Sequence, residues 1–109
     1  MKTGDIILIP FPFAEFTKRK VRPAAVVCET GDDYKDLVLC AISSVVPPKL
    51  TQNEVFLSVD KENCLRKDSV LKVDRIVRAK EQDVIAEIGK MSDADRKEFK
   101  EKFEGLIDE

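Results

Sequence analysis

The most informative absence in this sequence is histidine, because none of its 109 residues is one. Histidine is the usual general base near neutral pH and a common ligand for zinc. Its absence excludes every Ser/His/Asp and Cys/His catalytic arrangement. Any catalysis by this chain must therefore use something other than an imidazole.

Cysteine and glycine are scarce and scattered. The three cysteines, Cys28, Cys40 and Cys64, are widely spaced and form no C-x-x-C pair, which argues against a disulfide framework and a zinc site. Their apolar neighbours predict buried thiols. The four glycines form neither a G-x-x-x-x-G-K-[ST] nor a G-x-G-x-x-G phosphate loop. The acidic residues are spread along the chain, so we expect no carboxylate-bound metal and no cofactor.

Long hydrophobic runs are also missing. No run approaches the roughly 20 residues that cross a bilayer, and the opening MKTGDIILIPFPF contains two prolines and lacks a signal-peptide cleavage site. We therefore expect a cytoplasmic protein that does not bind membranes. At 12.3 kDa, with 43% hydrophobic residues, the chain is predicted to form a single domain over residues 1–109.

Charge is distributed unevenly along a chain whose net charge is -2. Residues 91–109 carry seven acidic and four basic side chains, whereas Lys18, Arg19, Lys20 and Arg22 place four positive charges within five residues. Such a cluster can form a local anion site on a protein that is not basic as a whole. A solvated hairpin loop is the ordinary alternative.

Short apolar runs separated by turn signals predict a β-rich body. We expect strands over 6–9, about 24–29, 37–42 and 54–59, and either two strands or one bent strand over 69–79. Residues 81–91 fit a helical turn or a short strand. The spacing of Phe99, Phe103, Leu106 and Ile107, after a Ser92 cap, predicts an amphipathic helix over 93–107. The fold class is mainly β (α+β): an SH3-like small β-barrel of five to seven strands with a C-terminal helix.

Arg22 occupies an unusual position, directly before a proline and an apolar run in VRPAAVVC. Pro23 fixes its own φ and disfavours helical backbone at Arg22, so the arginine is held extended. An always-charged guanidinium at the mouth of a buried strand is either a solvated edge residue or a contact for an anion.

Four blocks of the sequence resemble those of a known protein family. GDIILIPFPF, VRPAAVV, LVLCAISS and KDSVLKVDRIVRA occur in the order found in the MazF/PemK-like toxins of bacterial type II toxin-antitoxin systems, which this chain closely resembles from about Gly4 to its C-terminal helix. The resemblance implies a metal-independent endoribonuclease, usually a homodimer, that cuts single-stranded mRNA and is neutralised by a cognate antitoxin protein. It also implies attack by the RNA 2′-hydroxyl, which leaves a 2′,3′-cyclic phosphate and a 5′-hydroxyl.

The resemblance assigns roles residue by residue. The family's catalytic arginine falls on Arg22, and its strand-end hydroxyl residue, most often threonine, falls on Ser43. The residues expected to contact RNA are Lys18, Arg19, Lys20, Ser44, Ser69 and Arg75. For Ser69, a structural hydrogen bond is an equal alternative. Arg75 stands where family members often have glutamine, so it either supplies a phosphate contact or changes the base preference.

Two other functions remain open from the sequence. One is a non-catalytic barrel that poisons a protein target, as DNA gyrase inhibitors of similar fold do. The other is a degenerate member that acts only as a regulatory partner. The low isoelectric point, about 5.3, favours these alternatives, whereas Arg22 and Ser43 favour RNA cleavage.

Overall fold

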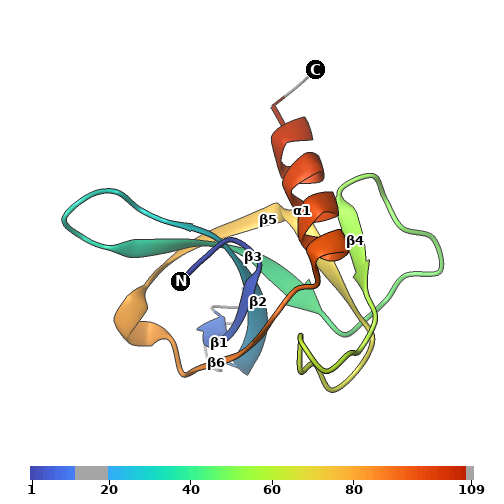
Figure 1. Cartoon of the computed structure of the whole chain (residues 1–109), viewed down its shortest axis with the longest axis horizontal. Helices are drawn as coiled ribbons and strands as arrows, with labels where there is room; N and C mark the ends of the chain where they lie inside the picture. Colours follow the sequence, from blue (N-terminus) through green and yellow to red (C-terminus); the bar gives the residue numbers. More distant parts are fainter. Residues whose placement is uncertain (12–19, 108–109) are drawn as a thin grey trace.

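The structure, a computed structural model, describes residues 1–11 and 20–107. Within them, the elements are β1 (Asp5–Phe11), β2 (Lys20–Glu29), β3 (Asp36–Ser43), β4 (Glu54–Leu57), β5 (Ser69–Lys80), a short 3-10 helix (Glu81–Asp83), β6 (Ala86–Lys90) and α1 (Asp93–Gly105). The strands form one antiparallel sheet in the order β4-β5-β3-β2-β1-β6, which curls into a half-barrel, and α1 packs near β4 and β5 (Figure 1). The predicted mainly β fold with a C-terminal helix is confirmed.

Both faces of the sheet are apolar, which explains why several strands are continuous hydrophobic runs rather than alternating ones. One face, which we call the helix face, carries the cluster that includes Ile6, Ala25 and Phe99. The opposite face carries a second cluster that includes Ile7 and Ala24. Successive strand residues therefore contribute to different clusters, as the period of two requires.

Helix α1 is stabilised by a capping residue at its start and by an aromatic pair, and it packs against β4. The Ser92 side chain accepts a hydrogen bond from the Asp95 N–H, as the predicted cap requires. Phe99 is 1% exposed and meets Phe103 edge to face, with ring centroids 6.3 Å apart. Beyond the end of the helix, Ile107 is 89% exposed, so the apolar stripe is buried only in part.

β2 begins earlier than predicted, at Lys20 rather than near Ala24. Pro23 pairs with Leu8 of β1, but the β2–β3 pairing begins only at Ala24. Over its first residues β2 therefore behaves as an edge strand on the β3 side, where proline is tolerated. This extension places Arg22 inside a regular strand rather than in the preceding loop.

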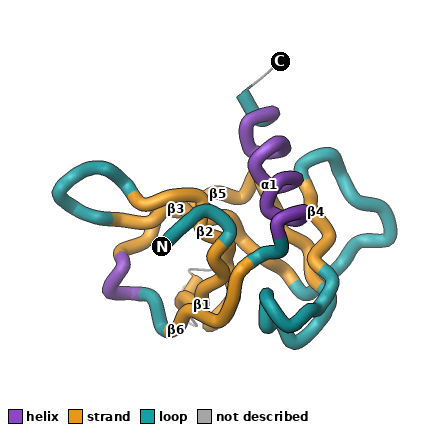
Figure 2. Tube along the Cα trace, in the orientation of Figure 1, coloured by secondary structure: helices purple, strands orange, loops and turns teal. Residues whose placement is uncertain are grey.

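The structure decides two alternatives that the sequence left open in the C-terminal half of the chain, over residues 69–79 and 81–91. Residues 69–80 form one long strand, whose pairing with β3 shifts between Cys40 and Ala41. Residues 81–91 contain a 3-10 turn followed by β6, which pairs with β1 (Figure 2). Helix α1 ends at Gly105, two residues short of the predicted end.

The prediction that all three thiols are buried was wrong for two of them. Cys40 is buried, and burial raises its pKa to about 12. Cys28 and Cys64 are exposed. Cys28 follows a break in the β2–β3 register, and Cys64 lies in a loop with a positive φ of 55°, so neither thiol points into a core strand position.

Candidate nucleic-acid interface

Arg22 and Ser43 come together at one end of the sheet. The β2–β3 pairing ends at Ala24 and Ala41. Arg22 lies two residues before the first of these, and Ser43 lies two residues after the second. Because the strands are antiparallel and side chains alternate, both side chains leave the sheet at the same end and on the face opposite the helix face. Both are half-buried, a position in which a side chain is held by the fold and still reaches solvent.

The Ser43 hydroxyl is oriented by a local turn. Its oxygen accepts a hydrogen bond from the Val45 N–H at 3.1 Å. This bond occupies a lone pair on the oxygen and does not use the O–H hydrogen. Ser43 is therefore arranged so that its hydroxyl can donate to an oxygen placed beside it.

The two neighbouring serines differ from each other. Ser44 directly follows β3 and is exposed. Ser69 begins β5 but is only 3% exposed, and its hydroxyl donates to the Lys67 carbonyl at 2.9 Å. This geometry favours the structural alternative for Ser69.

Arg75 lies away from the Arg22 end of the sheet. It is exposed, and it sits in the segment of β5 where the pairing moves from Lys72–Ala41 to Ile76–Cys40. Ile76, the next residue, pairs with Cys40, which lies three residues from Ser43 along β3, a separation of roughly 10 Å. The structure therefore does not bring Arg75 beside Ser43.

The predicted basic loop is described only at its end. Lys20 is exposed at the start of β2, and Lys18 and Arg19 lie outside the described residues.

Two further side chains share the face of Arg22 and Ser43. Lys72 pairs with Ala41 and Phe56 pairs with Val70, so both point to the face opposite the helix face. Lys72 Nζ lies 3.3 Å from Glu54 Oε2. The alternation of residues 54–59 separates Phe56 from its buried neighbours, but that pattern alone gives no sign that β4 lies near Ser43.

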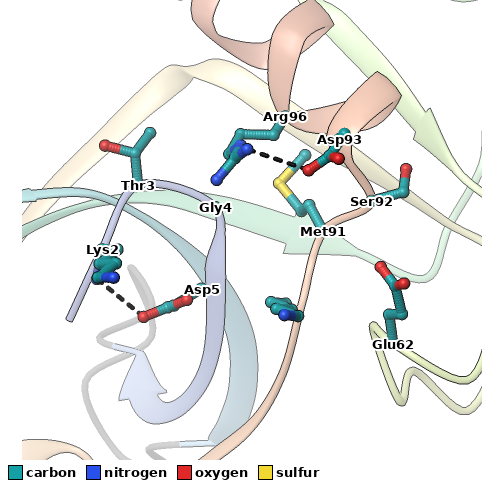
Figure 3. Close-up of a pocket in the computed structure, with 10 residues that line it drawn as sticks. Lys2, Thr3, Gly4, Asp5, Glu62, Met91, Ser92, Asp93 and Arg96 are labelled. Carbon is teal, nitrogen blue, oxygen red and sulfur yellow. Dashed lines mark hydrogen bonds and ion pairs between the residues drawn. The ribbon is translucent and has the colours of Figure 1, made fainter.

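A cavity of about 350 Å³ lies elsewhere, between the start of β1, the end of β6 and the N-terminus of α1 (Figure 3). Its lining includes Lys2, Lys90 and Arg96, and the last of these is paired with Asp93 at 3.0 Å. In β1, Asp5 lines the cavity whereas Ile9 pairs with Arg22. The cavity and the arginine therefore lie at opposite ends of the strand.

The described part of the chain offers neither a metal-binding cluster nor a membrane-spanning helix. In residues 1–11 and 20–107, no three cysteine, aspartate or glutamate side chains are grouped so that they could hold a metal ion. No helix in the same ranges has the length and apolar character that a membrane span requires.

Comparison with known families identifies the class of protein. The family model described as PemK-like, MazF-like toxin of type II toxin-antitoxin system matches residues 2–107. The chain therefore belongs to this toxin family, as its four sequence blocks predicted.

Solved structures share the fold. An endoribonuclease in complex with its cognate antitoxin, from a mycobacterial species, has a TM-score of 0.74 at 10% identity, covering 99% of this chain and 95% of that one. The Mycobacterium tuberculosis toxin MazF-mt6 has a TM-score of 0.69 at 18% identity, covering 95% and 96%. A search of curated protein sequences found no match. At these identities the structural likeness establishes the fold.

Proposed function

We propose that this toxin is a metal-independent endoribonuclease that cuts single-stranded RNA, principally mRNA in the cytoplasm, at short sequences. The observation that carries the proposal is the placement of Arg22 and Ser43 at one end and on one face of the sheet. Membership of the MazF-like family supports it, as does the structural likeness to a protein described as an endoribonuclease.

The proposed reaction takes its nucleophile from the RNA. The 2′-oxygen forms a bond to the adjacent phosphorus while the bond from phosphorus to the 5′-oxygen breaks. The 2′-hydroxyl loses its proton, and the departing 5′-oxygen gains one. The protein must then align these groups and stabilise the charge that builds on the phosphoryl oxygens, tasks for which an imidazole is not essential.

Arg22 supplies most of that stabilisation in this proposal. A guanidinium offers a planar fork of N–H donors that matches two phosphate oxygens, and it stays charged at any physiological pH. Because a guanidinium is not deprotonated in proteins, it is a poor proton carrier. We therefore assign Arg22 to charge stabilisation through paired hydrogen bonds, and Ser43 to a further donor on the same phosphate.

The remaining proposed contacts are peripheral. Lys18, Arg19 and Lys20 would line the RNA path next to Arg22, and Ser44 would lie beside the phosphate. Arg75 would contact RNA farther along its path, in place of the glutamine that family members often have. Ser69 is the weakest member of this set because its hydroxyl already bonds to Lys67.

We also propose a homodimer and an antitoxin partner. The family resemblance supports both, and one structural neighbour is described in complex with its cognate antitoxin. Phe99 packs on its own sheet, but Ile107 remains 89% exposed after α1, which offers apolar surface near the C-terminal helix. Light scattering at micromolar concentration should give twice the chain mass, and a 12.3 kDa particle would contradict the dimer.

The experiment that tests the function is incubation of the purified protein with a long single-stranded RNA in excess EDTA, followed by mapping of the new ends. We expect cuts at a short recurring sequence, with 2′,3′-cyclic phosphate and 5′-hydroxyl ends. Activity that disappears with EDTA and returns with Mg²⁺ would overturn the mechanism. Absence of cutting under all conditions would favour the non-catalytic binding alternative.

A further inference from the structure

An aromatic side chain on β4 is left out of the core. Val55 and Leu57 are fully buried in the helix-face cluster, whereas Phe56 between them is 40% exposed. A single exposed apolar residue is common on protein surfaces and implies nothing by itself. Phe56 differs from such a residue because it lies close to the proposed site.

Phe56 belongs to the same cross-strand row as Ser43. It pairs with Val70 of β5, and Val70 pairs with Ser43 of β3. Directly paired residues on neighbouring strands point to the same face. Two strand spacings separate Phe56 from Ser43, which corresponds to about 10 Å. Arg22 lies on the far side of Ser43, on β2.

The chemistry changes along this row. Arg22, a permanent cation, stands at one end, and the Ser43 hydroxyl lies next to it. The buried Val70 follows, and the aromatic ring of Phe56 stands at the other end. In the adjacent row, the charge of Lys72 is offset by Glu54, whose carboxylate lies 3.3 Å away. The surface near Phe56 therefore suits an uncharged planar group better than a phosphate.

We propose that Phe56 is a stacking platform for a nucleobase of the RNA, adjacent to the nucleotide whose phosphate is held by Arg22 and Ser43. The inference rests on the proposed function and extends it to the path of the substrate. Single-stranded nucleic acid is commonly bound by aromatic rings beside a basic groove, and loss of one such ring weakens binding by about 5- to 150-fold. Stacking tolerates any base, so Phe56 adds affinity and position rather than sequence choice.

The absence of tryptophan from the sequence makes a direct test simple. Phe56→Trp introduces a single tryptophan into the proposed platform, and a base stacked on it should quench its fluorescence. The ligand is an oligoribonucleotide that spans a mapped cut site and carries a 2′-deoxy nucleotide at the attacking position, so that it binds without being cut. The matched control is Tyr34→Trp, an exposed aromatic position (79%) in the β2–β3 turn, at the opposite end of β3 from Ser43.

We expect saturating oligonucleotide to quench the fluorescence of the Phe56→Trp protein and to leave that of the Tyr34→Trp protein unchanged. Phe56→Ala should weaken binding by 5- to 150-fold, Phe56→Tyr should restore it, and Tyr34→Ala should have no effect. In single-turnover assays, Phe56→Ala should raise the protein concentration that gives half the maximal rate by the same factor. The exposure of Phe56 favours folding of the variants, and unfolding curves provide the check.

Two results would overturn the inference. Quenching that is equal at the two positions, or wild-type RNA affinity in Phe56→Ala, would show that the ring contacts no base. The same affinity combined with loss of the dimer would assign Phe56 to a protein interface instead. If the protein cuts RNA but the Phe56 variants change neither RNA affinity nor fluorescence, only this inference fails. If the unaltered protein neither binds nor cuts RNA, the proposed function fails as well.

Discussion

Replacement of Ser43 by alanine separates a structural role of this hydroxyl from a catalytic one. In the folded protein, the Ser43 oxygen accepts the Val45 N–H at 3.1 Å in an exposed turn. A hydrogen bond of this kind contributes about 0.5–1.5 kcal/mol, and at an exposed site water replaces part of it. The free energy of unfolding should therefore fall by no more than about 1 kcal/mol.

The predicted effect on activity is much larger. If Ser43 donates to a phosphoryl oxygen only in the transition state, its removal should lower the single-turnover rate by about 10²- to 10³-fold, equivalent to about 2.7–4 kcal/mol. Ser43→Thr retains the hydroxyl and should keep most of the activity. Urea unfolding and single-turnover cleavage of the same preparations measure both quantities. A folded Ser43→Ala protein that cuts RNA at the unaltered rate would refute the assignment.

The remaining predictions concern the guanidinium, the base preference and the dependence of stability on pH. Arg22→Lys keeps a positive charge but loses the fork, so cleavage should fall nearly as far as in Arg22→Ala; a lysine variant with near-normal rates would show that charge alone is sufficient. Arg75→Gln should change which sites are cut, as mapped by RNA sequencing, while much of the total activity remains; unchanged sites would exclude Arg75 as a sequence reader. The pKa of Glu54 is lowered, chiefly because its carboxylate accepts the Thr51 N–H and also because of Lys72. This stabilisation is complete above the usual glutamate pKa and is lost as the pH falls through the lower folded value. The urea midpoint should therefore drop between about pH 5 and pH 3, and it should drop less steeply in Glu54→Gln.

Local sequence patterns predicted most of the strands because each is an apolar run bounded by turn residues. They could not predict the pairing partners, and this accounts for the main errors. Pro23 was expected to precede its strand, but it lies within β2 because the β2–β3 pairing starts only at Ala24. Residues 86–90 become a strand because β1 pairs with them, and this contact joins residues distant in the sequence.

The candidate site was predictable to a similar extent. The resemblance to the toxin family suggested Arg22 and Ser43 as candidate residues, which stays a prediction, and the alternating pattern of residues 54–59 placed Phe56 away from its buried neighbours. That Phe56 and Ser43 share one row depends on the register of β4, β5 and β3, which is a long-range property. The distance of Arg75 from Ser43 likewise depends on the irregular pairing of β5 with β3, which the sequence pattern does not predict.

We propose that the RNA supplies the nucleophile while Arg22 and Ser43 stabilise the phosphate. The most direct test is cleavage of two oligonucleotides that differ only by a 2′-deoxy nucleotide at the mapped cut site. We expect the all-ribose strand to be cut and the 2′-deoxy strand to bind but stay intact, because the attacking group is missing. Cleavage of both strands at the same rate would show that water attacks the phosphorus and would rule out the RNA 2′-oxygen as the nucleophile.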